Sequence, residues 1–423
     1  MKSKWAWLLL LPVLAHCAVV ASTVFFEDYT TLAWSDLAML GGTLAYLVAL
    51  AVVLRSGKGL KPFLIGTYSL LALYAVVELT AQALFPRVPA GLPLVPGVRE
   101  SVAADTMPGI SGPITYSVNS LGVRGPEVDL GEMDLKILCL GSAITEARYV
   151  TDRKSWPWLL QDNLAERLGR TVFVGNAGRS IDIAIQHDYL LRNYPHTQEF
   201  DWVVVACGTN DANVRLDGIY GEFVEGMEHN VLTPAREPVP VYAYYRHSAL
   251  PRAWRALFAR EESEMDDRGE WYETEREIRR RKLAETPLSS LPPELDVMVD
   301  SYRADLERLV ATCREMNLKL VMLTHPTRFG KDLPPEVTDT FVLYQQRGVY
   351  VPEVMERIVA EFNGTMRDVC AAHGVDCIDL DAELPKDETV FFDELHINTS
   401  GNERIARIVT EFFVRKLKGN DGA

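Results

Sequence analysis

The sequence predicts an α/β domain built on a parallel β-sheet with helices on both faces, preceded by three transmembrane helices. The N-terminal region holds long apolar stretches, whereas the rest of the chain alternates short apolar runs with segments of helical spacing. Strands that alternate with helices are typical of a parallel sheet covered on both faces. Glycine-containing turns follow several of the apolar runs, at the sheet edge where such proteins bind ligands.

Three stretches within residues 1–86 are long enough to cross a membrane as helices, and we assign this region to the membrane. They cover about residues 5–26, 33–54 and 63–85. A helix needs roughly 20 apolar residues to span a hydrocarbon core of about 30 Å. A cleaved signal peptide or a lipoprotein leader is the alternative for the first stretch, because Leu14-Ala15-His16-Cys17 resembles a lipoprotein cleavage box. The two apolar stretches that follow at once favour membrane helices.

Positive charges set the predicted orientation of these helices. Lys2 and Lys4 precede the first span, and Arg55, Lys58 and Lys61 lie between the second and the third. Short loops rich in lysine and arginine stay in the cytoplasm. The third span therefore exits outward, and we expect everything after it to lie outside the cytoplasm, with the lipid bilayer as a partner.

Composition excludes some functions and leaves others open. The formal net charge of −15 and the absence of a basic stripe argue against nucleic acid as a partner. The spacing of the six cysteines does not suggest a metal site. Cys370 and Cys377 flank a helix-to-strand turn and could form a disulfide outside the cytoplasm. The sequence identifies no protein partner.

Composition also divides the chain after the membrane region. Residues 87–134 start with a proline-rich stretch and read as a linker and entry segment. Residues 135–423 form the predicted α/β domain. Within it, residues 215–300 interrupt the alternation and are dense in charges of mixed sign at helical spacing. A solvated helical insertion is one interpretation of this segment, and a lid or partner surface over the ligand crevice is the other.

The elements of the α/β domain follow from the apolar pattern. The predicted strands are Lys136–Leu140, Thr171–Val174, Trp202–Ala206, Leu318–Leu323 and Val375–Leu380. Helical spacing predicts helices over Trp156–Leu168, Ile181–Tyr194 and Asn398–Leu417. Gly141, Gly178 and Gly208 fall just after three of the strands, so we expect them to cluster in space.

The turn after the first of these strands is suited to present a nucleophile. It reads Gly141-Ser142-Ala143-Ile144-Thr145-Glu146, and Gly141 permits a tight approach of strand and helix. Position 143 is alanine, although its surroundings call for a nucleophilic side chain.

Two neighbouring turns supply candidate hydrogen-bond donors for an oxyanion. Gly178 could donate its backbone N–H with no side chain in the way. Asn210 could donate from its side chain, although asparagine at this point can also cap a helix. Asp211 is interpreted as a cap or a local structural group. His325 follows another strand, and we interpret it as a structural histidine rather than one that lines the site.

Asp393 and His396 form the candidate general base. They stand three residues apart before a predicted helix. This spacing lets the carboxylate reach the imidazole within one turn and fix its tautomer.

Four separated motifs together resemble the SGNH, or GDSL-type, hydrolases. They are Gly141 to Glu146, Gly178 in GNAG, Asn210 in GTND, and Asp393 with His396 in DELH, in the family's order, and the resemblance covers roughly Lys136–Lys418. The run Asn119–Pro126 is similar to membrane-linked bacterial members. The resemblance implies a three-layer α/β/α, flavodoxin-like fold and hydrolysis of acyl esters on glycans or lipids. It implies no metal and no organic cofactor.

Carried over by position, the resemblance implies a role for each residue. Asp393 orients His396, which deprotonates the nucleophile, and the N–H of residue 143, the N–H of Gly178 and the side chain of Asn210 hold the oxyanion. The chain departs from the family at Ala143, where the family has its serine. A substitution made in an active enzyme, a natural pseudoenzyme, and a nucleophile shifted to Ser142 are the three explanations.

We therefore expect an ester hydrolase of SGNH type, attached to the bacterial cytoplasmic (inner) membrane as a multi-pass protein, with its catalytic domain on the extracytoplasmic side. The copy with Ala143 is expected to be inactive or impaired. A binding or assembly protein for acylated glycans and an O-acyltransferase are the alternatives.

Overall fold

The structure is a computed structural model that describes residues 48–49, 51–53, 55–56, 60–84, 91–103, 109–110, 112–228 and 268–420. The chain divides into two compact units. The first comprises Met1–Arg87 and Ala235–Glu261, and the second comprises Val88–Pro234 and Glu262–Ala423.

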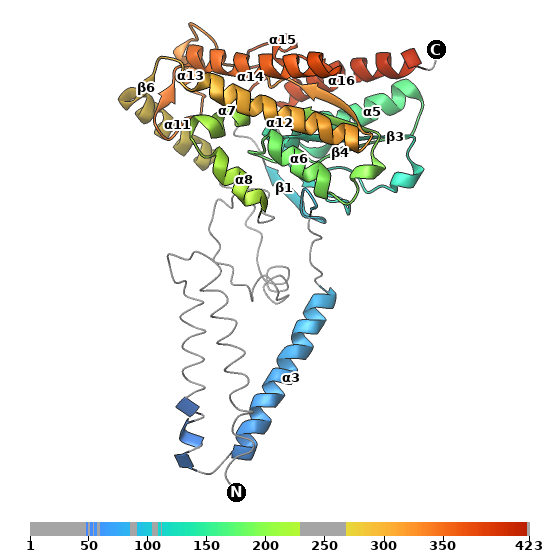
Figure 1. The fold of residues 1–423 in the computed structure, drawn as a ribbon, viewed down its shortest axis with the longest axis vertical. Helices are drawn as coiled ribbons and strands as arrows, with labels where there is room; N and C mark the ends of the chain where they lie inside the picture. Colours follow the sequence, from blue (N-terminus) through green and yellow to red (C-terminus); the bar gives the residue numbers. More distant parts are fainter. Residues whose placement is uncertain are drawn as a thin grey trace. The chain divides into compact units, whose positions relative to one another are not determined.

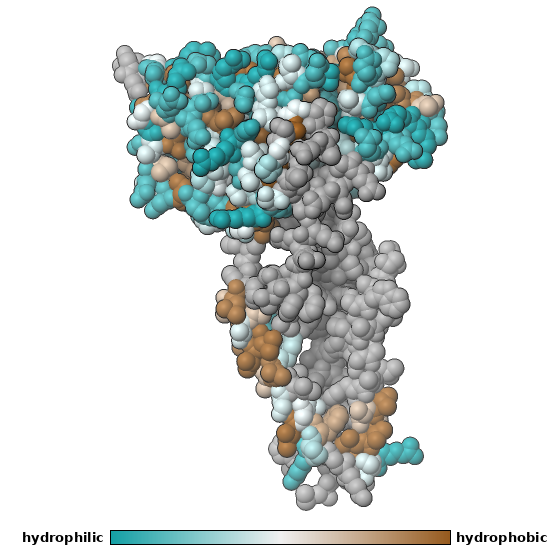
Figure 2. All heavy atoms as spheres, turned by 180° about the vertical axis from the view of Figure 1, so that it is seen from behind, coloured by the Kyte–Doolittle hydropathy of each residue, from teal (hydrophilic) through white to brown (hydrophobic). Residues whose placement is uncertain are grey.

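In the described part of the first unit, one helix is long and apolar enough to cross a membrane. Helix α3 covers Leu60–Leu84, and its Lys61–Ala81 segment meets this criterion by length and composition. Apolar side chains are exposed along it. Figure 2 shows hydrophobic residues on this unit, whereas the surface of the second unit is mostly hydrophilic. Of the three predicted spans, only the third thus has a counterpart in the described part of the chain. The first lies outside the described residues, and so does most of the second.

The second unit is built on a five-stranded parallel sheet. Its strands are β3 (Leu135–Gly141), β4 (Val172–Asn176), β5 (Trp202–Ala206), β7 (Lys319–Leu323) and β9 (Asp376–Ile378). Their order across the sheet is β4-β3-β5-β7-β9, and every neighbouring pair is parallel. Counted along the chain this is order 2-1-3-4-5, that of flavodoxin-like folds. The α/β fold class predicted from the apolar pattern is confirmed.

Helices cover both faces of this sheet (Figure 1). One layer holds α6 (Ala184–Asn193), α12 (Leu295–Glu315) and α14 (Pro352–His373), and α7 (Thr209–Leu216) packs against α12 and α14. The other layer holds α5 (Trp156–Leu168) and α16 (Thr399–Asn420), which pack against each other. The domain is therefore a three-layer α/β/α sandwich.

Side chains that alternate between the two faces of the sheet form two separate apolar clusters, one under each helix layer. Leu138 and Leu140 of β3 join the apolar cluster under α6, α12 and α14. Ile137 and Cys139 join the cluster under α5 and α16. Successive side chains of a strand point to opposite faces of the sheet, so a strand buried on both faces is apolar throughout. This is the reason that the five strands stand out in the sequence.

Shorter elements complete the unit. The entry segment forms the antiparallel pair β1 (Arg99–Ala103) and β2 (Pro113–Ser117). Strands β6 (Pro287–Leu288) and β8 (Val349–Tyr350) form a second small sheet. The remaining helices are α4 (Ala143–Glu146), α8 (Tyr220–Glu228), α11 (Arg268–Glu285), α13 (Pro335–Thr338), α15 (Leu380–Glu383), η2 (Leu130–Glu132), η3 (Asp152–Lys154) and η4 (Thr197–Glu199).

The charged insertion is in part an ordered helix. Helix α11 lies inside the predicted insertion at 215–300, and Tyr272 and Arg279 on it are buried. Arg279 is buried and donates to the carbonyls of Leu343 and Thr338 at 3.1 and 3.2 Å. Lys282 donates to the carbonyl of Gln345 at 3.0 Å. One face of this charged helix is thus bound to the domain rather than solvated.

Candidate active site

The strand-to-helix turns of β3, β4 and β5 meet at the carboxyl edge of the sheet. The N–H of Arg179, next to Gly178, donates to the carbonyl of Gly141 at 2.9 Å. The N–H of Ala184 donates to the carboxylate of Asp211, one residue after Asn210, at 2.9 Å. The three turns that the sequence predicted to cluster are therefore in contact.

The first turn places residue 143 at the start of a short helix. Ser142 is the N-cap of α4, and the backbone N–H groups of Thr145 and Glu146 both donate to its carbonyl at 2.9 Å. Residue 143 is the first helical residue, so its own N–H has no partner within the helix. The side chain of Ser142 is buried, whereas Ala143 is partly exposed. A side chain at 143, not at 142, is therefore exposed on this turn.

Gly178 is required by its close approach to this turn. A Cβ atom at position 178 would lie 2.3 Å from the backbone nitrogen of Glu146 and 2.7 Å from the carbonyl carbon of Thr145. The N–H of Gly178 donates to the side-chain oxygen of Asn176 at 2.9 Å. An oxyanion held by Gly178 would have to share this N–H with the Asn176 oxygen, or take the place of that oxygen as its acceptor.

Asn210 lies in the first turn of α7, beside the loop that follows Gly178. Its side-chain nitrogen is 3.4 Å from the carbonyl of Asp182, which is a long hydrogen bond. A weak partner of this kind leaves the amide available to a better acceptor. Asp211 is buried and accepts the N–H groups of Ala184 and Gly208 at 2.9 and 3.1 Å. Burial raises the pKa of Asp211 to about 7, and its contacts fit the predicted local structural role.

Asp393 and His396 form a tight pair. The carboxylate of Asp393 is fully buried and lies 2.6 Å from Nδ1 of His396. Its other oxygen accepts the backbone N–H groups of Leu395 and His396 at 2.8 and 2.7 Å. These bonds hold Nδ1 in its protonated form and direct Nε2 away from the carboxylate. His396 therefore has the orientation and the tautomer of a general base.

The charges around His396 favour its protonated form. Burial works against the charged imidazole, but the carboxylate of Asp393, with Glu394 and Glu146, outweighs burial and raises the pKa of His396 above 6.5. Burial works to raise the pKa of the Asp393 carboxyl. The charge and ring N–H of His396, together with backbone N–H donors, outweigh burial and lower this pKa. Each partner thus stabilises the charge of the other.

Three aromatic rings that the sequence did not single out surround the imidazole. Phe392 stacks on His396, with ring centroids 5.5 Å apart and planes 8° apart. Tyr149 and Tyr272 approach edge-on, with centroids 6.2 and 6.4 Å from that of the imidazole. Tyr272 comes from α11, in the charged insertion. No spacing rule links Tyr272 to His396, and the sequence carries no signal of this contact beyond an aromatic residue within a charged run.

Two further residues support the nucleophile turn and were also missed. Arg124 is buried and donates to the carbonyls of Glu146 and Ala147 at 2.7 Å and of Val150 at 2.5 Å. Its Nε lies 2.8 Å from Asp152. Glu146 accepts the backbone N–H of Ser180 at 2.8 Å and so ties this turn to the loop after Gly178. Arg124 belongs to the run Asn119–Pro126, which the sequence marked without a role.

His325 is a buried histidine with a local partner. Its Nδ1 donates to the carbonyl of Pro326 at 3.1 Å, and its backbone N–H donates to Asn363 at 3.0 Å. Burial, with a smaller contribution from the nearby charge of His396, lowers its pKa to about 4. His325 is therefore neutral, and its hydrogen bonds favour the structural interpretation.

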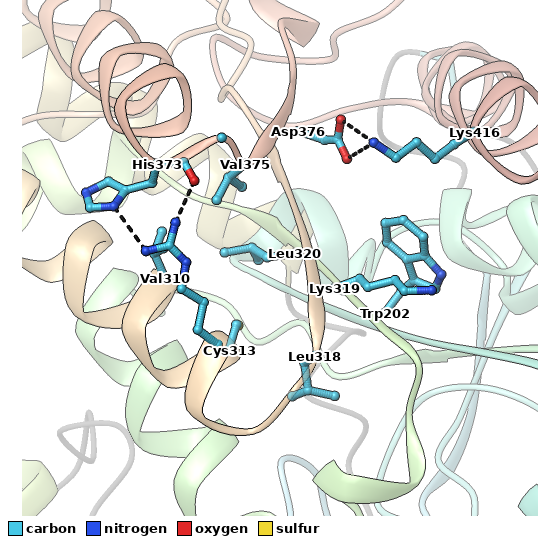
Figure 3. Close-up of a pocket in the computed structure, with 12 residues that line it drawn as sticks. Trp202, Val310, Cys313, Leu318, Lys319, Leu320, His373, Val375, Asp376 and Lys416 are labelled. Carbon is cyan, nitrogen blue, oxygen red and sulfur yellow. Dashed lines mark hydrogen bonds and ion pairs between the residues drawn. The ribbon is translucent and has the colours of Figure 1, made fainter. Parts of the chain in front are cut away.

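A separate hollow of about 360 Å³ lies at the opposite edge of the sheet (Figure 3). It opens at the amino ends of β5, β7 and β9, which begin with Trp202, Lys319 and Asp376. Lys416 lies 2.8 Å from Asp376, and Arg314 donates to the carbonyl of His373 at 2.5 Å. Lys416 and Asp376 thus form an ion pair in this hollow, and none of the five candidate site residues lines it. Within the described residues, no group of histidine, cysteine and carboxylate side chains is placed to hold a metal ion.

The flavodoxin-like sheet, the oriented His396 and a turn after β3 that exposes residue 143 fit the class of SGNH-type ester hydrolases. The sequence comparison agrees, because residues 139–404 match the family model described as GDSL-like lipase/acylhydrolase. This match covers more than half of the chain, which therefore belongs to that family of carboxylic ester hydrolases. No curated protein sequence matches the chain.

Solved structures of esterases are similar at low sequence identity. An α/β hydrolase enzyme from the metagenome of Lake Arreo, Spain, is 15% identical, with 66% of this chain and 94% of that one covered and a TM-score of 0.37. An acetylxylan esterase from Geobacillus stearothermophilus is 13% identical, with the same coverage and TM-score. The psychrotrophic esterase EstA from Pseudoalteromonas sp. is 14% identical, with 67% and 100% covered and a TM-score of 0.35.

Proposed function

We propose that the chain is the scaffold of a membrane-anchored esterase that acts outside the cytoplasm on an acylated glycan or lipid, and that Ala143 leaves this copy inactive or impaired. The observation that carries the proposal is the 2.6 Å contact between Asp393 and His396, together with a turn that exposes residue 143. Tyr149, three residues after the end of α4, meets the ring of His396 and links the two. An Asp–His pair of this kind serves to activate a hydroxyl nucleophile.

The proposed reaction assigns one task to each residue. With serine at position 143, Nε2 of His396 takes the hydroxyl proton as the oxygen attacks the acyl carbon. Asp393 stabilises the imidazolium that forms. The N–H of residue 143, with Gly178 and Asn210, stabilises the negative oxygen of the tetrahedral intermediate. His396 then returns the proton to the leaving alcohol, and water releases the acyl group by the same steps.

With alanine at position 143 the first step has no attacking oxygen. The remaining donors and the substrate contacts can still leave roughly 10³-fold acceleration over the reaction in water. A substitution made in an active enzyme and a natural pseudoenzyme both fit Ala143. The third explanation, attack by Ser142, is disfavoured by the burial of Ser142.

The test is hydrolysis of nitrophenyl acetate by the full chain in detergent, before and after Ala143→Ser. We expect a gain of at least about 10³-fold in kcat, because a hydroxyl is restored to an otherwise complete set of residues. Ser142→Ala in the restored background is the matched control and should keep the activity. No gain on Ala143→Ser would refute position 143 as the nucleophile site.

Membrane attachment and orientation are part of the proposal. The apolar helix α3 supports attachment to the bilayer. The lysine residues before the first predicted span, and the lysine and arginine residues between the second and the third, support an outward-facing C-terminal unit. A reporter fused to the C-terminus is expected to be active only outside the cytoplasm. Activity of a cytoplasm-specific reporter at this position would refute the orientation.

Ala143 itself favours a second candidate, a protein that binds acylated glycans without cleaving them. Binding of an acetylated oligosaccharide to the Ala143→Ser chain with no turnover would support this candidate. An acyltransferase uses the same nucleophile, and transfer of the acyl group to an added sugar rather than to water would identify it.

A further inference from the structure

Tyr272 brings a hydroxyl group to the Asp393–His396 pair from outside the four family motifs. Its oxygen lies 3.3 Å from Nδ1 of His396, the atom that also contacts Asp393 at 2.6 Å. The Tyr272 side chain is 3% exposed. A buried phenol placed this close to a catalytic imidazole has to be satisfied by hydrogen bonds.

The direction of these hydrogen bonds follows from the available protons. Nδ1 carries a single proton, which it donates chiefly to Asp393 and, at the longer distance, to the oxygen of Tyr272. Tyr272 is also hydrogen-bonded to Tyr149, whose oxygen can accept the hydroxyl proton of Tyr272. Burial raises the pKa of Tyr272 well above 10, so the phenol stays neutral. A short chain of bonds thus runs from His396 through Tyr272 to Tyr149.

Tyr272 is held in place by the rest of its helix. Tyr272 and Arg279 are seven residues apart on α11 and therefore share one face, and both are buried. Arg279 donates to the carbonyl of Leu343, and the backbone N–H of Leu343 donates to Glu394, the residue after Asp393. The insertion helix and the catalytic loop are thus bound to the same segment of chain.

We propose that Tyr272 is a positioning residue for His396. Its oxygen accepts a second, longer hydrogen bond from the Nδ1 N–H, and its ring, with Tyr149 and Phe392, fixes the plane of the imidazole. The role rests on the proposed function of His396 as the general base. It makes the charged insertion a part of the active site, which the family motifs alone do not include.

The effect of the Tyr272 hydroxyl on His396 has a definite sign. Nδ1 is protonated in both states of the imidazole, but the charged ring is the stronger donor. The Tyr272 oxygen therefore stabilises imidazolium more than imidazole. The titratable groups whose charge acts on this imidazole are Asp393, Glu394, Glu146 and His325. Tyr272→Phe leaves all four in place.

The test is a nitrogen-15 NMR titration of His396 in the full chain in detergent, with Ala143 retained. The signal is assigned by its loss in His396→Gln. Tyr272→Phe is expected to lower the pKa of His396 by about 0.3 to 0.7 unit, the worth of one modest hydrogen bond. The phenylalanine ring keeps the aromatic packing, so the fold is preserved.

Tyr220→Phe is the matched control, because its hydroxyl bonds Asp305 at 2.9 Å on a different part of the domain. It should leave the pKa of His396 unchanged. An equal titration in wild type and Tyr272→Phe would overturn the proposal. Since this titration needs no activity, it separates failure of the Tyr272 role from failure of the proposed esterase.

A kinetic readout follows in the Ala143→Ser background. Tyr272→Phe is expected to lower kcat about 3- to 10-fold with little change in KM, and to move the midpoint of the pH–rate profile down with the pKa of His396. An increase in KM with unchanged kcat would contradict a positioning role.

Discussion

The carboxylate of Asp393 binds His396 twice, at Nδ1 of the imidazole at 2.6 Å and at the backbone N–H at 2.7 Å. One acidic group thus fixes both the ring and the loop that carries it. A histidine held this way has the tautomer that the proposed reaction with a hydroxyl at position 143 requires.

The first prediction concerns pH. His396 must be neutral to act as a base, and its pKa is raised above 6.5. Activity of the Ala143→Ser chain should therefore rise with increasing pH through a midpoint above 6.5. Asp393→Asn removes the charge that raises this pKa, so the midpoint should move down while kcat falls by about 10⁴. A midpoint at or below 6.5 in the Ala143→Ser chain would contradict this account of His396.

The second prediction concerns Gly178. Gly178→Ala forces a Cβ to within 2.3 Å of the Glu146 nitrogen, so the turn that carries residue 143 has to move. Unfolding by urea should show a loss of stability of about 2 kcal/mol or more.

Gly364→Ala is the matched control for this change. A Cβ at Gly364, inside α14, meets no atom nearer than 3.7 Å. Alanine there should stabilise the protein by about 0.5–1 kcal/mol, because glycine is a poor helix former. Similar effects of the two substitutions would show that the contact with Glu146 is not what requires Gly178.

The third prediction concerns Arg124. It pairs with Asp152 at 2.8 Å in the interior and donates to the carbonyls of Glu146, at the end of α4, and of Ala147 and Val150 after it. Arg124→Ala leaves a buried carboxylate without its partner and should cost about 3–5 kcal/mol in urea unfolding. Arg167→Ala removes a surface pair with Glu411 of similar length, 2.9 Å, and should cost less than about 1 kcal/mol. Equal costs would refute the structural role of Arg124.

The fourth prediction concerns cysteine. Cys370 and Cys377 are free thiols hydrogen-bonded to each other. If the second unit lies outside the cytoplasm, as we propose, oxidation should join them in a disulfide. Alkylation and mass spectrometry of the full chain from membranes should find both unreactive before reduction and reactive after it. The unit expressed without residues 1–86 in a reducing cytoplasm should keep both thiols. Free thiols in the membrane form would argue against the proposed location.

The strands were predictable because each is buried on two faces. Strand β5 and helix α5 have the predicted bounds, Trp202–Ala206 and Trp156–Leu168. Helix α6 begins at Ala184 rather than Ile181. The residues before it form the loop after Gly178, where Asp182 is occupied by an ion pair with Arg179. Local polar contacts of this kind override helical spacing at an element's end.

The site was predictable to the extent that its parts are local. Asp393 and His396 are three residues apart, so their contact follows from the sequence. Tyr272 meets His396 across more than a hundred residues, and Arg124 meets the nucleophile turn through its carbonyls. Contacts between distant segments, and contacts to backbone atoms, leave no spacing pattern in the chain. Gly178 is an example of a contact to a backbone atom, because its N–H donates to the side chain of Asn176.

The central claim is that His396 and its neighbours are arranged to activate an oxygen at position 143. The most direct test is covalent labelling of the full chain by a fluorophosphonate, followed by mass spectrometry of the labelled peptide. Ala143→Ser should be labelled at position 143, and the label should be lost when His396→Ala is added. The unsubstituted chain should take up none. Labelling of Ser142 instead, or no labelling of the Ala143→Ser chain, would contradict the account.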